Sequence, residues 1–194
     1  MNNNVLRIIG RNHTAEDTVR AFFSAREEGF DNINMDLIAG LPSDTAESYH
    51  QTLDRIIDLN PESITVHTLT IKRSAKIYED DIEKYLTAPA SEMVNESIRT
   101  LPENGYLPYY LYRQKNTVEN LENIGFAKKE RESLYNIFIM DETQTILGAG
   151  CAASTKIVQP NGKITRIHNY KFPYEYINRF DDLMRKKQII YELI

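Results

Sequence analysis

Short apolar runs alternate with amphipathic helical patterns over the first seventy residues, and this alternation constrains the fold more than any other feature. Apolar runs at residues 5–9, 32–38 and 62–68 have the length of strands, and the segments between them carry apolar residues at helical spacing. Strands joined by such helices must run parallel, because each connection has to travel back along the sheet. We therefore expect an α/β architecture with three parallel strands and two crossover helices.

The ends of the two crossover helices are readable from single residues. Thr14 is a suitable N-cap for the first helix, and Gly29 is a suitable stop. The second helix presents Leu53 and its apolar neighbours on one face and is expected to end near Asn60 and Pro61.

The second half of the chain gives a looser pattern. A polar loop precedes a helix around Val94 and Leu101, and strands are predicted at 107–113, 134–140 and 164–168. Residues 114–132 look polar and irregular. Pro173 is expected to open a last helix whose buried face comprises Tyr176, Ile177, Phe180, Leu183 and Met184.

Composition bounds the class of protein. With 194 residues the chain is shorter than the ~250 of a complete (β/α)8 barrel. Its 23 basic and 28 acidic residues give a net charge of -5, which argues against nucleic acid as a partner. Cys151 is the only cysteine, so this chain alone offers no disulfide and no multi-thiolate metal site. We expect no metal ligands.

The chain shows neither a secretory signal nor an apolar run near the ~20 residues of a membrane span. A cytoplasmic protein without a membrane partner is therefore expected.

Polar residues next to the expected strands are the candidates for a site, since ligands of parallel sheets gather at the carboxyl ends of the strands. Asp36 stands between two apolar residues, and the alternation of a strand places it on the same face as Asn34. An anionic carboxylate there needs donors. It either holds the amides of a neighbouring loop or binds a ligand.

Arg11 follows the first expected strand and is suited to clamp a carboxylate, although an ordinary ion pair fits equally well. His13 and His67 are more typical of packed or capping residues than of catalysts. Cys151 is more typical of an inert thiol than of a nucleophile. The basic pairs at 128–129 and 185–187 are expected on solvated faces.

Two further segments have an unusual composition. Residues 148–154 carry almost no side-chain bulk, which permits a close approach of the backbone to another surface or to a ligand. Four tyrosines gather just before or within the strand expected at 107–113, and they form either an aromatic platform or ordinary strand packing: Tyr106, Tyr109, Tyr110 and Tyr112.

Residues 34–42 read N-M-D-L-I-A-G-L-P. This resembles the N-x-D-L-I-x-G-L-P segment of radical S-adenosylmethionine enzymes of the oxygen-independent coproporphyrinogen III oxidase (coproporphyrinogen dehydrogenase) family. Supporting segments are G-R-N-H-T at 10–14, L-N-P at 59–61 and G-A-G at 148–150. The segments Y-R-Q-K-N at 112–116 and N-L-E-N-I-G at 120–125 are similar to the dehydrogenase branch of anaerobic and Gram-positive bacteria.

The resemblance implies an incomplete (β/α)6 barrel that holds a 4Fe-4S cluster and S-adenosylmethionine and converts two propionate side chains of a tetrapyrrole to vinyl groups in haem biosynthesis. It implies cofactor-binding roles for four residues: Arg11, Asp36, Thr70 and Ser154. It implies a partial barrel over residues 1–115, the later strands of the family's barrel, and a C-terminal α+β extension over residues 116–194.

One departure from the family is decisive. The family's C-x-x-x-C-x-x-C motif is missing, so this chain alone is expected to bind no cluster and to be inactive. We expect it to correspond to the later half of the enzyme. The expected strand at 5–9 would then expose an unpaired edge, which invites a homodimer or association with an N-terminal half.

A haem-binding or haem chaperone protein is the alternative, because relatives with the same barrel have that role. Their H-N-x-x-Y-W segment is not evident, and tryptophan is absent. A nonenzymatic interaction domain is the third possibility.

Overall fold

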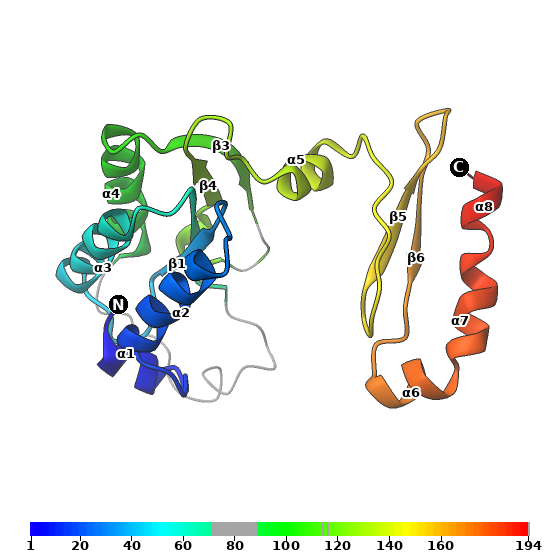
Figure 1. The fold of residues 1–194 in the computed structure, drawn as a ribbon, viewed down its shortest axis with the longest axis horizontal. Helices are drawn as coiled ribbons and strands as arrows, with labels where there is room; N and C mark the ends of the chain where they lie inside the picture. Colours follow the sequence, from blue (N-terminus) through cyan, green and yellow to red (C-terminus); the bar gives the residue numbers. More distant parts are fainter. Residues whose placement is uncertain (71–88, 114, 116, 194) are drawn as a thin grey trace. The chain divides into compact units, whose positions relative to one another are not determined.

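The computed structural model describes residues 1–70, 89–113, 115 and 117–193 (Figure 1). The polar loop predicted before Val94 falls largely outside these residues, as do Gln114 and Asn116. The chain forms two compact units, Met1–Glu132 and Ser133–Ile194. The division between the compact units follows Glu132.

The first unit contains a four-stranded sheet whose order is β1-β2-β4-β3. Strands β1 (Asn34–Ala39) and β2 (Ser63–Thr68) run parallel, as predicted, and α3 (Ala46–Leu59) joins them. Strand β4 (Asn123–Ala127) is antiparallel to β2 and to β3 (Leu107–Tyr112). The sheet is therefore mixed, and β4 lies in the segment predicted to be irregular.

The strand predicted at residues 5–9 does not form, and that prediction was wrong. The segment belongs to helix α1 (Asn3–Ile8), in which only Val5 is buried. The Asn2 side chain caps the helix by accepting hydrogen bonds from the N–H groups of Asn4 and Val5, at 2.9 and 3.3 Å. A five-residue apolar run has no periodicity that separates a strand from a helix, so the cap decides.

The helices between residues 14 and 103 follow the sequence pattern. Helix α2 (Ala15–Glu27) begins with a capping box between Thr14 and Asp17, and α3 ends at Asn60 in the left-handed conformation, with φ of 59°. Helix α4 (Ala90–Glu103) keeps Pro102 in its last turn. A short 3-10 turn, η3 (Val118–Asn120), precedes β4.

The sheet has an apolar face and a polar face. On the apolar face α3 and α4 pack against a buried cluster that includes Met35, Leu37, Ile64 and Val66. The opposite face of β1 and β2 carries Asn34, Asp36, Ile38, Ser63, Thr65 and His67. The predicted alternation along β1 is confirmed, because Met35 and Leu37 are buried.

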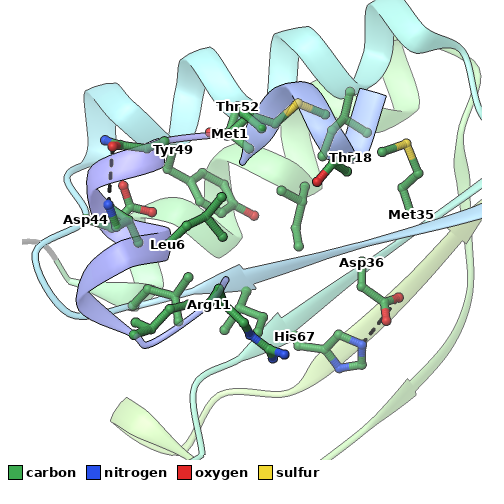
Figure 2. A pocket seen from close by; sticks show the side chains of 18 of the residues that line it. Met1, Leu6, Arg11, Thr18, Met35, Asp36, Asp44, Tyr49, Thr52 and His67 are labelled. Atoms are coloured by element: carbon green, nitrogen blue, oxygen red, sulfur yellow. Dashed lines mark hydrogen bonds and ion pairs between the residues drawn. The ribbon is translucent and has the colours of Figure 1, made fainter. Parts of the chain in front are cut away.

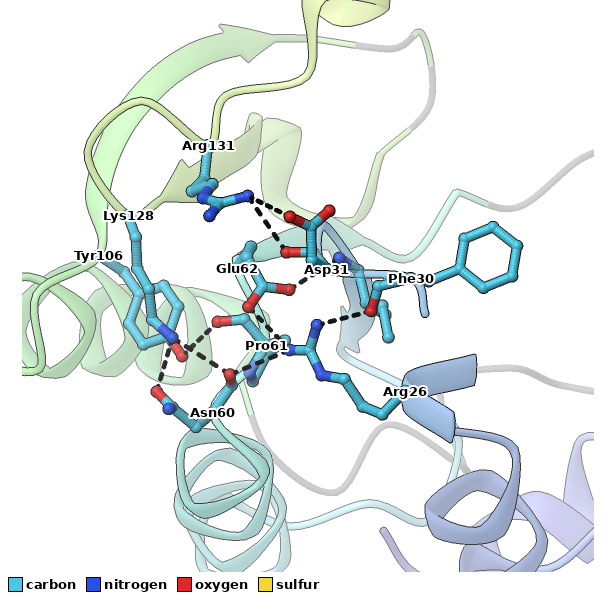
Figure 3. Close-up of polar contacts among 10 residues, drawn as sticks. Arg26, Phe30, Asp31, Asn60, Pro61, Glu62, Tyr106, Lys128 and Arg131 are labelled. Carbon is cyan, nitrogen blue, oxygen red and sulfur yellow. Dashed lines mark hydrogen bonds and ion pairs between the residues drawn. The ribbon is translucent and has the colours of Figure 1, made fainter. Parts of the chain in front are cut away.

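A cluster of charged groups fixes the starts of β1 and β2 (Figure 3). Glu62 accepts hydrogen bonds from Arg26 Nη2 at 2.7 Å and from the Ile33 N–H at 2.9 Å. Lys128 Nζ donates to the backbone and side-chain oxygens of Asn60, at 3.1 and 2.6 Å, and lies over the Tyr106 ring. The charge pattern predicted a solvated face for Lys128. The structure shows instead that its amine binds Asn60 and lies over the Tyr106 ring.

The second unit is built around the antiparallel pair β5 (Ser154–Val158) and β6 (Ile164–His168). The strand predicted at 134–140 is instead helix α5 (Leu134–Asp141), because the Ser133 hydroxyl caps it by accepting from the Asn136 N–H. The predicted last helix is divided into α6 (Pro173–Asn178), α7 (Phe180–Lys187) and α8 (Ile190–Leu193).

Of the predicted apolar face of that last helix, Leu183 is buried but Ile177 is 71% exposed. No helix among the described residues is long and apolar enough to cross a membrane.

Candidate functional site

A pocket of about 350 Å³ lies along the edge of the sheet formed by β1, between that strand and helices α1, α2 and α3 (Figure 2). Its apolar lining includes Met1, Val5, Leu6, Met35, Leu37 and Ile56. Four polar side chains that sequence reasoning had singled out also line it: Arg11, His13, Asp36 and His67. Two of the four predicted cofactor-binding residues thus meet in one cavity.

Asp36 is held by donors on its own strand and on β2. Its Oδ1 accepts a hydrogen bond from Asn34 Nδ2 at 2.7 Å and lies 3.6 Å from His67 Nε2 (Figure 2). Hydrogen bonding to His67, followed by the smaller contribution of Asn34, lowers the pKa of the Asp36 carboxyl below its ordinary value despite partial burial. Asp36 is therefore an anion at neutral pH.

The carboxylate is more open than its apolar neighbours suggested, because 59% of its side chain is exposed. Its donors are side chains of the sheet, and no loop amide among the described residues donates to it. The structural role considered for Asp36, holding a loop, is therefore not the one observed here.

Arg11 reaches the pocket by a different route from the predicted one. It follows a helix rather than a strand: its N–H donates to the Leu6 carbonyl at 2.8 Å, after Gly10 has turned the chain with φ of 73°. The side chain is exposed and extends toward His67 (Figure 2), and with the described residues it forms no ion pair. Its guanidinium remains available to an anion.

The other predicted residues are placed elsewhere. Thr70 pairs with Thr117 in an isolated bridge and is absent from the pocket lining. Ser154 begins β5 in the second unit. Cys151 donates to the Lys171 carbonyl at 2.9 Å. The structure thus brings Arg11 and Asp36 together and leaves the cofactor roles of all four residues as predictions.

Sequence reasoning gave His67 too little weight. His67 is paired with Ile38 across β2 and β1, and Asp36 is paired with Thr65, so the imidazole and the carboxylate project from the same face. The signal was the two-residue spacing of Thr65 and His67 along a strand, but the register against β1 is needed to use it.

A permanent cation and an anion at the mouth of one pocket suit a zwitterionic ligand. Guanidinium binds carboxylate with charge-assisted hydrogen bonds, and a carboxylate accepts from ammonium or hydroxyl groups. An apolar floor beside them accommodates the uncharged part of such a ligand. The donor set therefore fits an amino acid attached to a larger group.

The described residues contain no group of three metal-ligating side chains, and the whole sequence has one cysteine. A cluster held by three thiolates does not fit this chain alone.

The fold is that of a radical S-adenosylmethionine enzyme. It matches the structure described as "Coproporphyrinogen III oxidase (HemN) from Escherichia coli is a Radical SAM enzyme", with a TM-score of 0.68 and 24% identity, over 94% of this chain and 41% of that one. The predicted partial β/α fold is thereby confirmed. No family model matches the chain.

Curated relatives narrow the class to a family. The chain is 43% identical over 189 residues to the oxygen-independent coproporphyrinogen-III oxidase-like protein HemZ of Bacillus subtilis, a match covering 95% of this chain and 38% of that protein. It is 27% identical to the haem chaperone HemW of Haemophilus influenzae, over 97% of this chain and 45% of that one. The chain belongs to the oxygen-independent coproporphyrinogen III oxidase family and spans about two fifths of the length of these relatives.

Proposed function

We propose that this chain supplies the part of a radical S-adenosylmethionine protein that binds the amino acid end of the cofactor, in an enzyme that oxidatively decarboxylates a tetrapyrrole's propionate groups. The observation that carries the proposal is the meeting of Arg11 and Asp36 at one pocket. The names of the relatives support the substrate class.

In this proposal Arg11 binds the carboxylate of S-adenosylmethionine, and Asp36, anionic because His67 and Asn34 hold it, accepts from the cofactor's ammonium or hydroxyl groups. Thr70 and Ser154 border the cofactor as the family resemblance implies. When bound, the cofactor supplies the radical that abstracts hydrogen from the substrate.

The test uses S-adenosylhomocysteine, which has the same amino acid end and is chemically stable. Calorimetric titration should detect binding to the wild-type chain and a loss of at least about tenfold in affinity for Arg11→Ala, since a charge-assisted pair contributes about 1.5–3 kcal/mol. Arg20→Ala, which removes an arginine that pairs with Asp17 at the surface, should bind normally. Absence of binding to the wild type, or equal binding by Arg11→Ala, overturns the proposal.

We further propose that the cluster-binding cysteines reside on polypeptide outside these residues, so that the isolated chain is inactive. Anaerobic reconstitution with iron and sulfide should yield no stable iron-sulfur protein. A chain that holds a cluster and cleaves S-adenosylmethionine would overturn this part.

The edge of β1 is the place where we propose that a partner strand adds, either from an N-terminal half or from a second copy. Strand β1 has one hydrogen-bonded neighbour within the described sheet, and its other side faces the pocket. We thus propose for β1 the unpaired edge that the sequence pattern had predicted for residues 5–9. A wild-type chain that stays monomeric at high concentration, and ignores a supplied N-terminal half, contradicts this.

A haem-binding role is the second candidate, and the matches to haem chaperones favour it. Titration with haem distinguishes the two: stoichiometric binding with a shifted Soret band supports a carrier. Absence of such a shift removes this candidate.

A further inference from the structure

Three tyrosines of β3 gather on the polar face of the sheet, the face that carries Asp36. Tyr110 is paired with Gly125, and Gly125 is paired with Thr65, which is paired with Asp36. Directly paired residues project from the same face, so this row leads from Asp36 to Tyr110 across four strands. A register shift between Pro108 and Tyr110 accompanies the contact between the Tyr109 and Tyr110 rings. We call Tyr109, Tyr110 and Tyr112 the tyrosine shelf.

The shelf has a defined internal geometry. The Tyr110 and Tyr112 rings are parallel to within 8°, with centroids 6.0 Å apart, and the Tyr109 ring packs edge-on against Tyr110 at 4.8 Å. All three rings are half-buried. Tyr106 is different, because it is buried in the core and donates to the Pro61 carbonyl. The four tyrosines therefore divide into one core residue and three that share a surface.

Gly125 makes room for the shelf. A Cβ at this position would lie 1.9 Å from Tyr110 Cε1, so the Tyr110 ring occupies the volume that any other residue would fill. The backbone of Gly125 does not have a positive φ, and glycine is therefore required here by the ring rather than by the strand. The Tyr110 ring can take this position because residue 125, in the middle of the buried strand β4, is a glycine.

The Tyr110 hydroxyl is hydrogen-bonded to Thr65, a polar residue on the same face of the sheet. Burial raises the pKa of Tyr110, and a hydrogen bond with Thr65 opposes the shift only in part. The Thr65 hydroxyl in turn donates to Asn34 Oδ1 at 3.0 Å, and Asn34 donates to Asp36. The shelf is thus continuous with the group that holds the carboxylate of the pocket.

We propose that the tyrosine shelf is a stacking subsite for a flat conjugated ring that binds over the face of the sheet that carries Asp36. This inference rests on the proposed function. Parallel aromatic faces favour stacking with a further planar ring, and a tyrosine hydroxyl that is hydrogen-bonded to Thr65 adds a polar edge. Two ring sources share this chemistry: the adenine of the cofactor and the pyrrole rings of the substrate.

The experiment compares four variants of the full chain with two probes, S-adenosylhomocysteine by calorimetry and coproporphyrin III by fluorescence titration. Tyr110→Ala should weaken binding of the stacked probe about tenfold, the usual size of a lost stacking contact. Gly125→Ala should do the same without removing any tyrosine, because its Cβ displaces the ring.

The two control variants define the mechanism. Tyr110→Phe keeps the ring and should retain most of the affinity. Tyr191→Ala, at a tyrosine that is 90% exposed in the second unit, should change nothing. Circular dichroism and thermal unfolding confirm that each variant folds, and Tyr112→Ala replaces Tyr110→Ala if the latter does not.

The outcome identifies the source of the ring. Selective weakening of the nucleoside assigns the shelf to adenine, and selective weakening of the porphyrin assigns it to the tetrapyrrole. If both probes bind wild type, Tyr110→Ala and Gly125→Ala equally, the shelf proposal is overturned while a loss on Arg11→Ala still supports the proposed function. If the wild type binds neither probe, both proposals fail.

Discussion

The two compact units are stabilised in different ways. The first buries a continuous apolar cluster between the sheet and helices α3 and α4, with Leu53, Ile64 and Val66 fully buried. In the second, the buried apolar side chains of the described residues are Ile157 and Leu183, and they share the interior with Thr155, Lys156 and Asn169. Apolar burial therefore determines the first unit far more than the second.

Hydrogen bonds to irregular backbone take a larger part in the second unit. Lys187 Nζ and Asn169 Nδ2 donate to the carbonyls of Gly148 and Gly150, each at 2.6 Å. Leu134 and Ile177 remain well exposed. A two-stranded sheet is marginal without packing, so the second unit should have the lower stability of the two.

Removing the same leucine side chain from each unit gives the largest expected contrast. Leu53→Ala should lower the free energy of unfolding by about 2–5 kcal/mol, because Leu53 is fully buried and a cavity remains. Leu134→Ala, at a residue 64% exposed, should change it by less than about 0.5 kcal/mol. Urea unfolding followed by circular dichroism measures both, and equal losses would refute the contrast.

The second largest effect on stability is expected in the cluster of charged groups at the starts of β1 and β2. Arg26→Ala leaves the largely buried Glu62 with one donor fewer and should cost about 1–3 kcal/mol. Arg20→Ala is the matched control, since Arg20 is 74% exposed and pairs at the surface with Asp17. Its cost should be at most about 1 kcal/mol. Similar effects of the two substitutions in urea unfolding would show that Glu62 needs no cation.

Lys156 tests whether hydrogen bonds hold the second unit. Its buried amine donates to the carbonyls of Phe138 and Ile139 near the end of α5, at 3.2 and 3.4 Å. Lys156→Met should lower the opening free energy of α5 by about 1 kcal/mol, measured by amide hydrogen exchange. Lys163→Met, at an exposed lysine, should leave exchange unchanged. Unaltered exchange in Lys156→Met would mean that α5 does not depend on this cap.

The smallest effect is expected at the contact between α3 and α4. The Glu96 carboxylate accepts a hydrogen bond from His50 Nδ1 at 2.6 Å, and this bond, together with the charge of Asp54, raises the pKa of His50 above its ordinary value of 6.5. A group whose pKa is raised by folding stabilises the fold below its unfolded pKa, and this contribution is lost as the pH rises through the folded pKa.

Proton NMR titration of His50 measures this pKa directly. Glu96→Gln should move it back toward 6.5, whereas Glu92→Gln should not. A pKa that ignores Glu96 would show that the contact is absent in solution.

The longer amphipathic helices of the first unit were predictable from neighbouring residues, whereas short apolar runs and contacts between distant residues were not. Helix α3 and its parallel strands follow from caps and periodicity. Strand β4 was not predicted because Asn123 and Gly125 are typical of turns. Gly125 is nevertheless part of the strand, where it leaves room for the ring of Tyr110 on the neighbouring strand.

The site shows the same limit. Asp36 was found from its own strand, but its partner His67 needed the register between two strands. Arg11 was predicted to reach the pocket from a strand and does so from a helix, because the short apolar run before it was misread.

The turn at Asn60 depends on both local and distant residues. Asn60 adopts the left-handed conformation between α3 and the start of β2. Its backbone and side-chain oxygens accept hydrogen bonds from Lys128, which is distant in the sequence. A change at the far end of β4 therefore alters how the chain leaves α3. We therefore expect a substitution of Asn60 to be tolerated best when residue 128 changes with it.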